Sequence, residues 1–336
     1  MYGPPFDAVV AKGGYLWWYL DVLSDDGQHA LTLIAFVGCV FSPFYARARA
    51  LRPGAADALD FCALNIALHD ARGHLAWSMT ERDAATVERS ADHLALGPST
   101  VSWEDDALVV RCDERTAAIG HFGAGRPLRG TLRLRPQPGC PRPTTAVTLD
   151  PAGRHRWWPI APIARAEVTF SEPALRFSGV AYHDGNQGDE ALEHAFRGWS
   201  WSRAALPSGA TAVLYDAVLR DGRERPRGWL FRADRAPEPL DPPCRAVLDR
   251  TRWRLARATR HDAGARPRVL RALEDTPFYA RALLQTQLAG EPALAVHEQL
   301  DLERFNRDWV RLLLPFRMRR GALAGALAWL STAPQK

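Results

Sequence analysis

The sequence is dominated by short segments in which apolar and polar residues alternate, and this alternation constrains the fold more than any other feature. A period of two is typical of β-strands with one buried face, whereas amphipathic helices repeat every 3.6 residues. Turn sequences such as Asp25-Asp26-Gly27 separate the segments. The pattern predicts about ten strands before residue 206 and about eight after it, with no strand–helix–strand rhythm.

Two successive sets of antiparallel strands predict an all-β protein with few helices, built as two barrels or sandwiches. A boundary near residue 206 gives each half enough strands to close a sheet. We therefore expect an N-terminal domain of residues 1–205 and a C-terminal domain of residues 206–336. The Pro-rich segment 236–243 is an alternative boundary, but it leaves only about six strands behind it, few for a closed barrel.

Three local predictions follow from the same pattern. The polar and basic stretch Pro43–Asp57 is predicted to be a long excursion at the mouth of a barrel. Gly179–Tyr182 is predicted to be a strand that Gly185–Gly188 ends, because Gly and Asn tolerate positive φ. Val310–Met318 is predicted to be the last strand.

The composition indicates a protein with a large core and a mildly basic surface. Hydrophobic residues make up 47% of the chain, and its 12 Trp suit an apolar ligand cavity as well as a core. The formal charge of +5 comes almost entirely from Arg, with no basic stripe interleaved with aromatic residues. We therefore expect no nucleic-acid partner and at most weak attraction to an anionic membrane surface.

The sequence also predicts where the protein works. Five scattered cysteines without a C-x-x-C pair indicate reduced thiols, and the N-terminus lacks the pattern of a signal peptide, which together predict a cytoplasmic protein. The most apolar stretch, Leu31–Ala46, is too short to cross a bilayer and contains Pro43. The basic and apolar tail from Arg317 predicts either a helix that lies on a membrane surface or one that docks on the body.

Several common catalytic motifs are absent. The sequence contains no G-x-S-x-G, P-loop or G-x-G-x-x-G motif, which disfavours serine hydrolases, NTPases and dinucleotide enzymes. His155, His183 and His194 lie in one region with Asp184, but they show no tight metal-site spacing. Surface or core histidines explain them more simply, so we expect no metal.

Two short motifs concentrate chemically capable side chains. In RHRWWP, residues His155 and Trp157 are two apart and so share one face of an extended strand. In YHDGNQG the same rule puts Tyr182 and Asp184 together and turns His183 away. If the two motifs share an inward face, these four side chains converge on one apolar cavity. From the residues alone, a structural hydrogen-bonded cluster explains them as well as a catalytic one.

The same motifs carry a family resemblance. YLWWYLDVLSDDGQHALTLIAFVGCVFSPFYARAR near the start, RHRWWP, and YHDGNQG followed by RGWSWSRA resemble the carotenoid 1,2-hydratases of photosynthetic bacteria. A looser resemblance extends to tandem lipocalin-like proteins that include pericyclic cyclases. The resemblance implies two lipocalin-like barrels, no cofactor, and addition of water to the terminal C1=C2 bond of an acyclic carotene such as neurosporene or lycopene.

The resemblance also implies the site residues. The functional His, Trp, Tyr and Asp of that family fall on His155, Trp157, Tyr182 and Asp184. Hydrating an unactivated alkene needs a strong proton donor, and burial among aromatic rings would keep a carboxylic acid neutral for this purpose. We therefore expect Asp184 to be the acid, the π faces of Trp157 and Tyr182 to stabilise a tertiary cation, and His155 or Tyr182 to hold the attacking water.

The substrate pocket, the membrane contact and two alternative functions can also be predicted. Six aromatic residues are predicted to line the substrate pocket: Trp17, Trp18, Phe41, Trp158, Trp199 and Trp201. The protein is expected to meet the inner membrane peripherally, because its substrate is dissolved there. Two alternatives stay open: a non-catalytic carotenoid or lipid carrier, and a cofactor-free isomerase or cyclase on the same scaffold.

Overall fold

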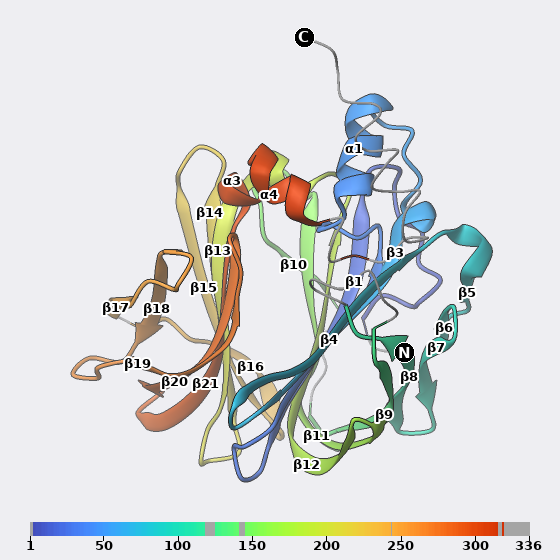
Figure 1. Cartoon of the computed structure of the whole chain (residues 1–336). Coiled ribbons are helices and arrows are strands. Elements are labelled where there is room, and N and C mark those ends of the chain that lie inside the picture. Colours follow the sequence, from blue (N-terminus) through green and yellow to red (C-terminus); the bar gives the residue numbers. More distant parts are fainter. Residues whose placement is uncertain (1–2, 118–124, 141–144, 243, 315–317, 319–336) are drawn as a thin grey trace.

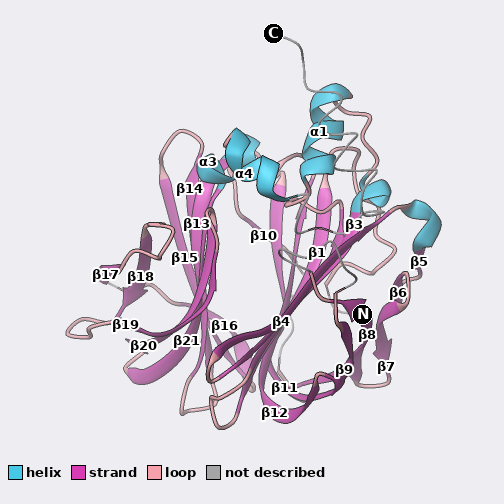
Figure 2. Ribbon diagram, viewed as in Figure 1, coloured by secondary structure: helices cyan, strands magenta, loops and turns pink. Residues whose placement is uncertain are grey.

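A computed structural model describes residues 3–117, 125–140, 145–242, 244–314 and 318. The described chain is built mainly of antiparallel strands in two large sheets, with a few short helices at one end (Figures 1 and 2). The expectation of an all-β protein with few helices is thus confirmed. The expectation of two consecutive barrels is not confirmed, because only the first sheet curls far enough to be nearly closed.

The first sheet has twelve strands. Eleven of them follow the order β4-β3-β2-β1-β12-β11-β9-β8-β7-β6-β5, and β10 pairs with β11. Their bounds are β1 Tyr15–Ser24, β2 Ala30–Val37, β3 Cys62–Asp70, β4 Gly73–Arg82, β5 Val87–Arg89, β6 His93–Leu96, β7 Ser99–Glu104, β8 Ala107–Arg115, β9 Pro127–Pro136, β10 Val147–Thr148, β11 His155–Glu172 and β12 Ala174–Gly188.

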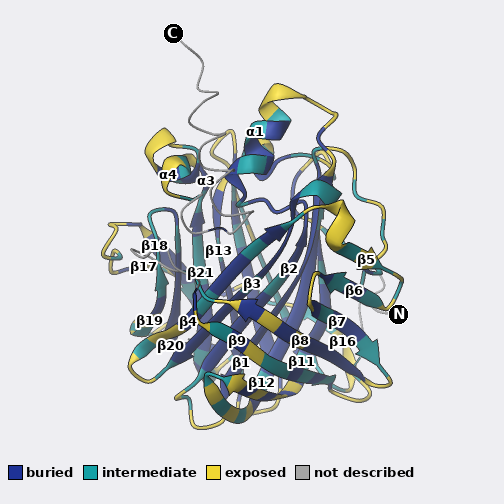
Figure 3. Ribbon diagram, turned by 45° about the vertical axis from the view of Figure 1, so that its right-hand side comes forward, coloured by how far each residue is buried: buried dark blue, intermediate teal, exposed yellow. Residues whose placement is uncertain are grey.

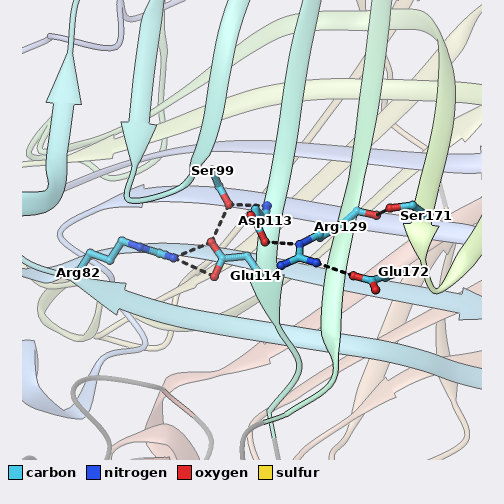
Figure 4. Close-up of polar contacts among 7 residues, drawn as sticks. All are labelled: Arg82, Ser99, Asp113, Glu114, Arg129, Ser171 and Glu172. Carbon is cyan, nitrogen blue, oxygen red and sulfur yellow. Dashed lines mark hydrogen bonds and ion pairs between the residues drawn. The ribbon is translucent and has the colours of Figure 1, made fainter.

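Polar contacts hold the edge strand β4 against β7 and β8 and so bring the curled sheet close to closure. The Arg82 guanidinium on β4 donates to both carboxylate oxygens of Glu114 on β8, at 2.8 and 2.9 Å (Figure 4). The Ser99 hydroxyl on β7 donates to the same carboxylate at 2.7 Å. Glu114 is buried, and such a charge is tolerated only where it is paired and hydrogen-bonded.

The second sheet has seven strands in the order β16-β15-β14-β13-β21-β20-β19, and β17 and β18 form a separate ribbon. The bounds are β13 Phe196–Ala205, β14 Thr211–Leu219, β15 Glu224–Arg232, β16 Arg235–Pro239, β17 Cys244–Leu248, β18 Arg257–His261, β19 Arg268–Asp275, β20 Tyr279–Leu288 and β21 Glu291–Asp301. Since β13 belongs to this sheet, the chain changes sheets between β12 and β13, ahead of residue 206.

Three apolar layers follow from this arrangement. One fills the interior of the curled first sheet, around residues such as Leu33 and Val110. A second lies between one face of the second sheet and the β17–β18 ribbon, with Leu248 among its members. The third combines aromatic residues of both sheets, including Trp157 and Trp201. We call this third one the inter-sheet layer.

Four α-helices and two 3-10 helices complete the described chain. They are α1 Pro43–Leu51, η1 Ala58–Phe61, η2 Ala84–Thr86, α2 Leu192–Ala195, α3 Leu302–Phe305 and α4 Asp308–Leu313. None of the described helices combines the length and apolarity needed to cross a bilayer. The helices α1, α3 and α4 lie at the same end of the molecule (Figures 1 and 3).

Two local predictions fall on these helices. The excursion Pro43–Asp57 begins with α1, whose first turn is fixed by Ser42: its hydroxyl accepts the Tyr45 N–H at 3.0 Å, and Pro43 follows at a position where its missing N–H costs nothing. The predicted strand Val310–Met318 is wrong, because the described part of that segment starts inside α4. The tail from Arg317 lies outside the described residues apart from Met318.

The prediction that Gly185–Gly188 ends a strand is also wrong, because β12 continues to Gly188. Neither Gly185 nor Gly188 adopts a positive φ. A Cβ at Gly188 would lie 2.3 Å from the Tyr15 ring and 2.8 Å from the His155 ring. Glycine is thus placed there for close packing of neighbouring side chains rather than for a turn.

Candidate active site

The two sequence motifs meet on adjacent central strands of the first sheet. Trp157 on β11 pairs with Asn186 on β12, and Asp184 pairs with Tyr19 on β1. Because side chains alternate along β12, Tyr182 and Asp184 share the face that meets the second sheet. His183 points to the opposite face, where its Nδ1 lies 2.8 Å from the Tyr19 carbonyl oxygen. The predicted alternation is therefore confirmed.

Asp184 is the centre of a buried hydrogen-bonded cluster. The Trp157 Nε1–H donates to Asp184 Oδ2 at 2.7 Å, and the Tyr182 hydroxyl donates to the same oxygen at 2.8 Å. Trp157 and Tyr182 are fully buried, and Asp184 is 4% exposed. Since both donors bind Oδ2, the other oxygen, Oδ1, is the atom on which a proton of the neutral acid would sit.

Burial raises the pKa of Asp184 to about 8. The two hydrogen bonds from Trp157 and Tyr182 oppose this shift, and the nearby carboxylates of Glu298 and Asp21 add to it. Removal of water is the largest cause, because an ion without its hydration shell is disfavoured more than the neutral acid. At neutral pH the Asp184 side chain is therefore mainly a carboxylic acid.

Aromatic side chains of the second sheet form the opposite side of the cluster. Trp201 on β13 lies 5.3 Å from Tyr182 between ring centroids, and Trp229 on β15 lies 4.7 Å from Trp157. Tyr215 on β14 lies 6.1 Å from Trp157 and accepts a hydrogen bond from the Asn186 amide at 3.3 Å. The acid is thus enclosed by π faces from two sheets.

His155 lies in the same layer but is not bonded to the acid. Its Nδ1 lies 2.9 Å from the Tyr15 hydroxyl, and its ring meets Phe196 edge-on at 4.9 Å. Its Nε2 lies 3.6 Å from a carboxylate oxygen of Glu190. Burial lowers the pKa of His155, although the charges of Asp150 and Glu190 oppose the shift, so the neutral imidazole is favoured.

Comparison with known proteins identifies the family. The chain matches the family of the carotenoid hydratase CrtC over residues 33–324. Acyclic carotenoid 1,2-hydratases from Thiocapsa roseopersicina and Rubrivivax gelatinosus are 49% and 44% identical to it over 319 residues, which is 95% of this chain and 76% of each relative. This chain belongs to the carotenoid hydratase family. The resemblance inferred from the sequence motifs is confirmed.

Solved structures show that this carotenoid hydratase family member shares its fold with more distant proteins. An AttH-type protein from Nitrosomonas europaea superposes with a TM-score of 0.60 at 14% identity, covering 85% of this chain and 91% of that one. Kievitone hydratase from Nectria haematococca superposes with a TM-score of 0.50 at 10% identity, covering 89% of this chain and 98% of that one. At these identities the likeness shows the fold alone.

The predicted pocket residues divide between the two faces of the first sheet. Trp17, Phe41, Trp199 and Trp201 belong to the inter-sheet layer with the acid. Trp18 and Trp158 lie on the other face, where the Trp18 Nε1–H donates to the Pro4 carbonyl oxygen at 3.1 Å. These two tryptophans therefore do not adjoin the acid. Each follows an inter-sheet residue directly in sequence, and consecutive strand residues face opposite ways.

A buried ionic network next to the acid escaped the sequence analysis. On β1, Asp21 accepts a hydrogen bond from Arg203 Nε at 2.8 Å and lies 3.4 Å from Arg281 Nη2. Arg281 Nη1 is 3.4 Å from Glu298 Oε1, and the Tyr19 hydroxyl lies 3.0 Å from Asp21 and 2.8 Å from Glu298. The members come from β1, β13, β20 and β21. Only the alternation of each separate strand could have indicated that these charges face inward.

No group of three or more His, Cys, Asp or Glu side chains in the described residues is arranged to hold a metal ion. The histidines considered as ligands are separated by the fold: His183 faces the interior of the first sheet, whereas His155 lies in the inter-sheet layer. His194 is exposed and lies 3.6 Å from Glu190.

Proposed function

We propose that this protein is a hydro-lyase that adds water across the terminal C1=C2 double bond of acyclic carotenes such as neurosporene and lycopene. The observation that carries the proposal is a neutral carboxylic acid, Asp184, held among aromatic rings of the inter-sheet layer. The acyclic carotenoid 1,2-hydratases to which the chain is similar support the substrate class.

The proposed reaction begins with proton transfer from Asp184 Oδ1 to C2 of the substrate. The π electrons of the double bond form the new C–H bond, which leaves a tertiary cation at C1 and a carboxylate on Asp184. Trp157 and Tyr182 already donate to Oδ2, so they stabilise the carboxylate as its charge develops. The aromatic faces of Trp157, Trp201 and Trp229 stabilise the cation.

Water then attacks C1, and the proton that it loses returns to the Asp184 carboxylate. Asp184 thus serves as acid in the first step and base in the second, and the enzyme ends in its starting state. His155 is assigned to the side of the site where water is held, because its Nε2 is buried and makes no direct hydrogen bond among the described residues, with the Glu190 carboxylate 3.6 Å away. Adding water is redox-neutral overall, so the proposal needs no redox cofactor.

The location is proposed on the same chemical grounds. An acyclic carotene is dissolved in a bilayer, so the enzyme is expected in the cytoplasm, bound peripherally to the inner membrane that holds its substrate. We assign the catalytic groups to the N-terminal domain of residues 1–205, and the C-terminal domain of residues 206–336 adds Tyr215 and Trp229 to the aromatic enclosure.

Asp184→Asn tests the proposal, with Asp189→Asn as the matched control. Asp189 is on the same segment but is exposed and paired with Arg156. With lycopene or neurosporene dispersed in detergent, we expect Asp184→Asn to lose hydration while retaining the fold, and the control to remain active. Mass spectrometry would detect a product heavier by one water. A product of unchanged mass would indicate an isomerase or cyclase, and binding without conversion would indicate a carrier.

A further inference from the structure

The short helices form a cap over one end of the inter-sheet layer. The helices α1 and α4 are joined through Glu193 of α2, whose carboxylate lies 3.4 Å from Arg49 and 3.8 Å from Arg311. Helices α3 and α4 follow directly from β21 of the second sheet, whereas α1 follows β2 of the first. The cap therefore spans both sheets at the end seen uppermost in Figures 1 and 3.

The underside of the cap is aromatic and continues into the layer that contains the acid. Phe305 of α3 is fully buried and lies 5.0 Å from Phe278 and 6.0 Å from Phe41 between ring centroids. Phe41 contacts Phe36 at 6.0 Å, and Phe36 contacts Trp17 at the same distance. These contacts form a continuous row of aromatic rings from the cap to Trp17 in the layer that contains the acid.

The outer side of the cap exposes large apolar side chains. Trp309 of α4 is 42% exposed and stacks at 6.1 Å on Trp253, which is 44% exposed and lies in the β17–β18 turn. Leu312, Leu313 and Leu51 of α4 and α1 are exposed as well. Nine large hydrophobic residues are exposed among the described residues, and five of them belong to this end. Such a concentration marks an interaction surface rather than ordinary scatter.

Exposed arginines lie beside the exposed tryptophans. Arg252 and Arg254 flank Trp253 in the turn, and Arg307 precedes α4; all three are exposed. The Arg304 guanidinium donates to the Trp253 carbonyl oxygen at 2.8 Å, which ties the turn to α3. Amphipathic Trp rings favour the membrane–water interface, and arginines beside them attract anionic headgroups.

We propose that the outer face of the cap docks on a bilayer containing anionic lipids and that the carotene passes from the bilayer beneath the cap to Asp184. The docking surface comprises Trp253, Trp309, Leu312, Leu313, Arg252 and Arg307. Passage of the carotene to Asp184 rests on the proposed function, whereas docking itself is independent of catalysis. A bilayer is favoured over a protein partner because the surface combines interfacial Trp with arginines and leads to a layer that suits a polyene.

The first test measures binding of the full chain, without substrate, to vesicles of phosphatidylcholine containing phosphatidylserine. The double variant Trp253→Ser/Trp309→Ser is expected to lose on the order of tenfold or more in partitioning. Leu270→Ser is the control, because Leu270 on β19 is 50% exposed but lies outside the cap. In detergent-dispersed substrate the double variant should hydrate at the wild-type rate, which also shows that it is folded.

The second test removes charge without touching the tryptophans. Arg252→Gln/Arg307→Gln is expected to weaken binding to phosphatidylserine vesicles about fivefold for each arginine, roughly 25-fold together, and to leave binding to pure phosphatidylcholine unchanged. Circular dichroism and the unfolding temperature verify the fold of each variant.

The proposal is overturned if the wild type does not sediment with phosphatidylserine vesicles, or if both double variants bind as the wild type does. It is also overturned if the tryptophan variant changes only the oligomeric state, measured by light scattering, since the surface would then join two copies of the chain. Binding that depends on the surface in a protein that hydrates no carotene would support docking and refute the proposed function.

Discussion

Replacing Asp184 with Asn is expected to stabilise the folded protein, and increasingly so as the pH rises. Burial raises the pKa of Asp184 from 3.8 to about 8, so between these pH values the folded protein keeps a proton that the unfolded chain has released. Each pH unit in this window therefore lowers the free energy of unfolding of the wild type by about 1.4 kcal/mol. The loss is absent below about pH 4 and is complete, at about 6 kcal/mol, above about pH 8.

The free energy of unfolding of the Asn variant should not show this fall with pH. Its side chain does not titrate, and its amide oxygen can accept the same two hydrogen bonds, from Trp157 and Tyr182, that Oδ2 accepts now. The difference in unfolding free energy between variant and wild type should thus grow by about 4 kcal/mol from pH 5 to pH 8. Other titrating groups are common to both proteins, so their contributions cancel in the difference.

Urea denaturation at pH 5, 6, 7 and 8 measures this difference, with tryptophan fluorescence and circular dichroism as two probes whose transitions must coincide. Asp189→Asn, an exposed control on the same segment, should give a small and flat difference. A flat difference for Asp184→Asn would mean that its carboxylate is ionised when buried, and the assignment of Asp184 as proton donor would be refuted.

Three further predictions concern the surroundings of Asp184 and its strand, β12. Trp157→Phe keeps an aromatic face but removes a donor to Asp184, so the rate should fall roughly 10- to 100-fold and the alkaline limb of the pH–rate profile should move to higher pH. Glu298→Gln removes a negative charge that raises the pKa of Asp184, so the alkaline limb should move to lower pH. The same change breaks a buried ion pair with Arg281, so urea denaturation should show that the free energy of unfolding falls by about 3 kcal/mol. Gly179→Ala should lower the unfolding temperature, with a cost of about 1–3 kcal/mol, because its Cβ would lie 2.0 Å from the Leu23 carbonyl oxygen.

The local geometry of the site could be predicted from the sequence because it depends only on strand alternation. The period of two placed Tyr182 with Asp184, turned His183 away and put His155 with Trp157, and each of these relations holds in the structure. The same rule separates Trp18 and Trp158 from the acid, because each directly follows a residue of the inter-sheet layer.

The charged partners from the second sheet could not be predicted, because they depend on how two sheets pack. Nothing in the local pattern of β20 or β21 shows that Arg281 and Glu298 would lie beside Asp21. The end of β12 was predicted wrongly for a related reason. Gly188 is typical of a turn in sequence, but in the structure it leaves room for the rings of Tyr15 and His155.

The ionic network gives a physical reason for the neutral acid. With Asp21 and Glu298 as carboxylates and Arg203 and Arg281 as cations, the network carries no net charge, and an ionised Asp184 would add an unbalanced buried anion. Proton transfer to a carotene creates that anion only together with a cation beside it, so the layer stays neutral throughout the step. Along β1, Trp17 of the aromatic row and Asp21 of the network lie two residues to either side of Tyr19, which pairs with Asp184. On the proposed route, a polyene that enters from the cap would reach Asp184 before it reaches the charged side chains of Asp21 and Arg281.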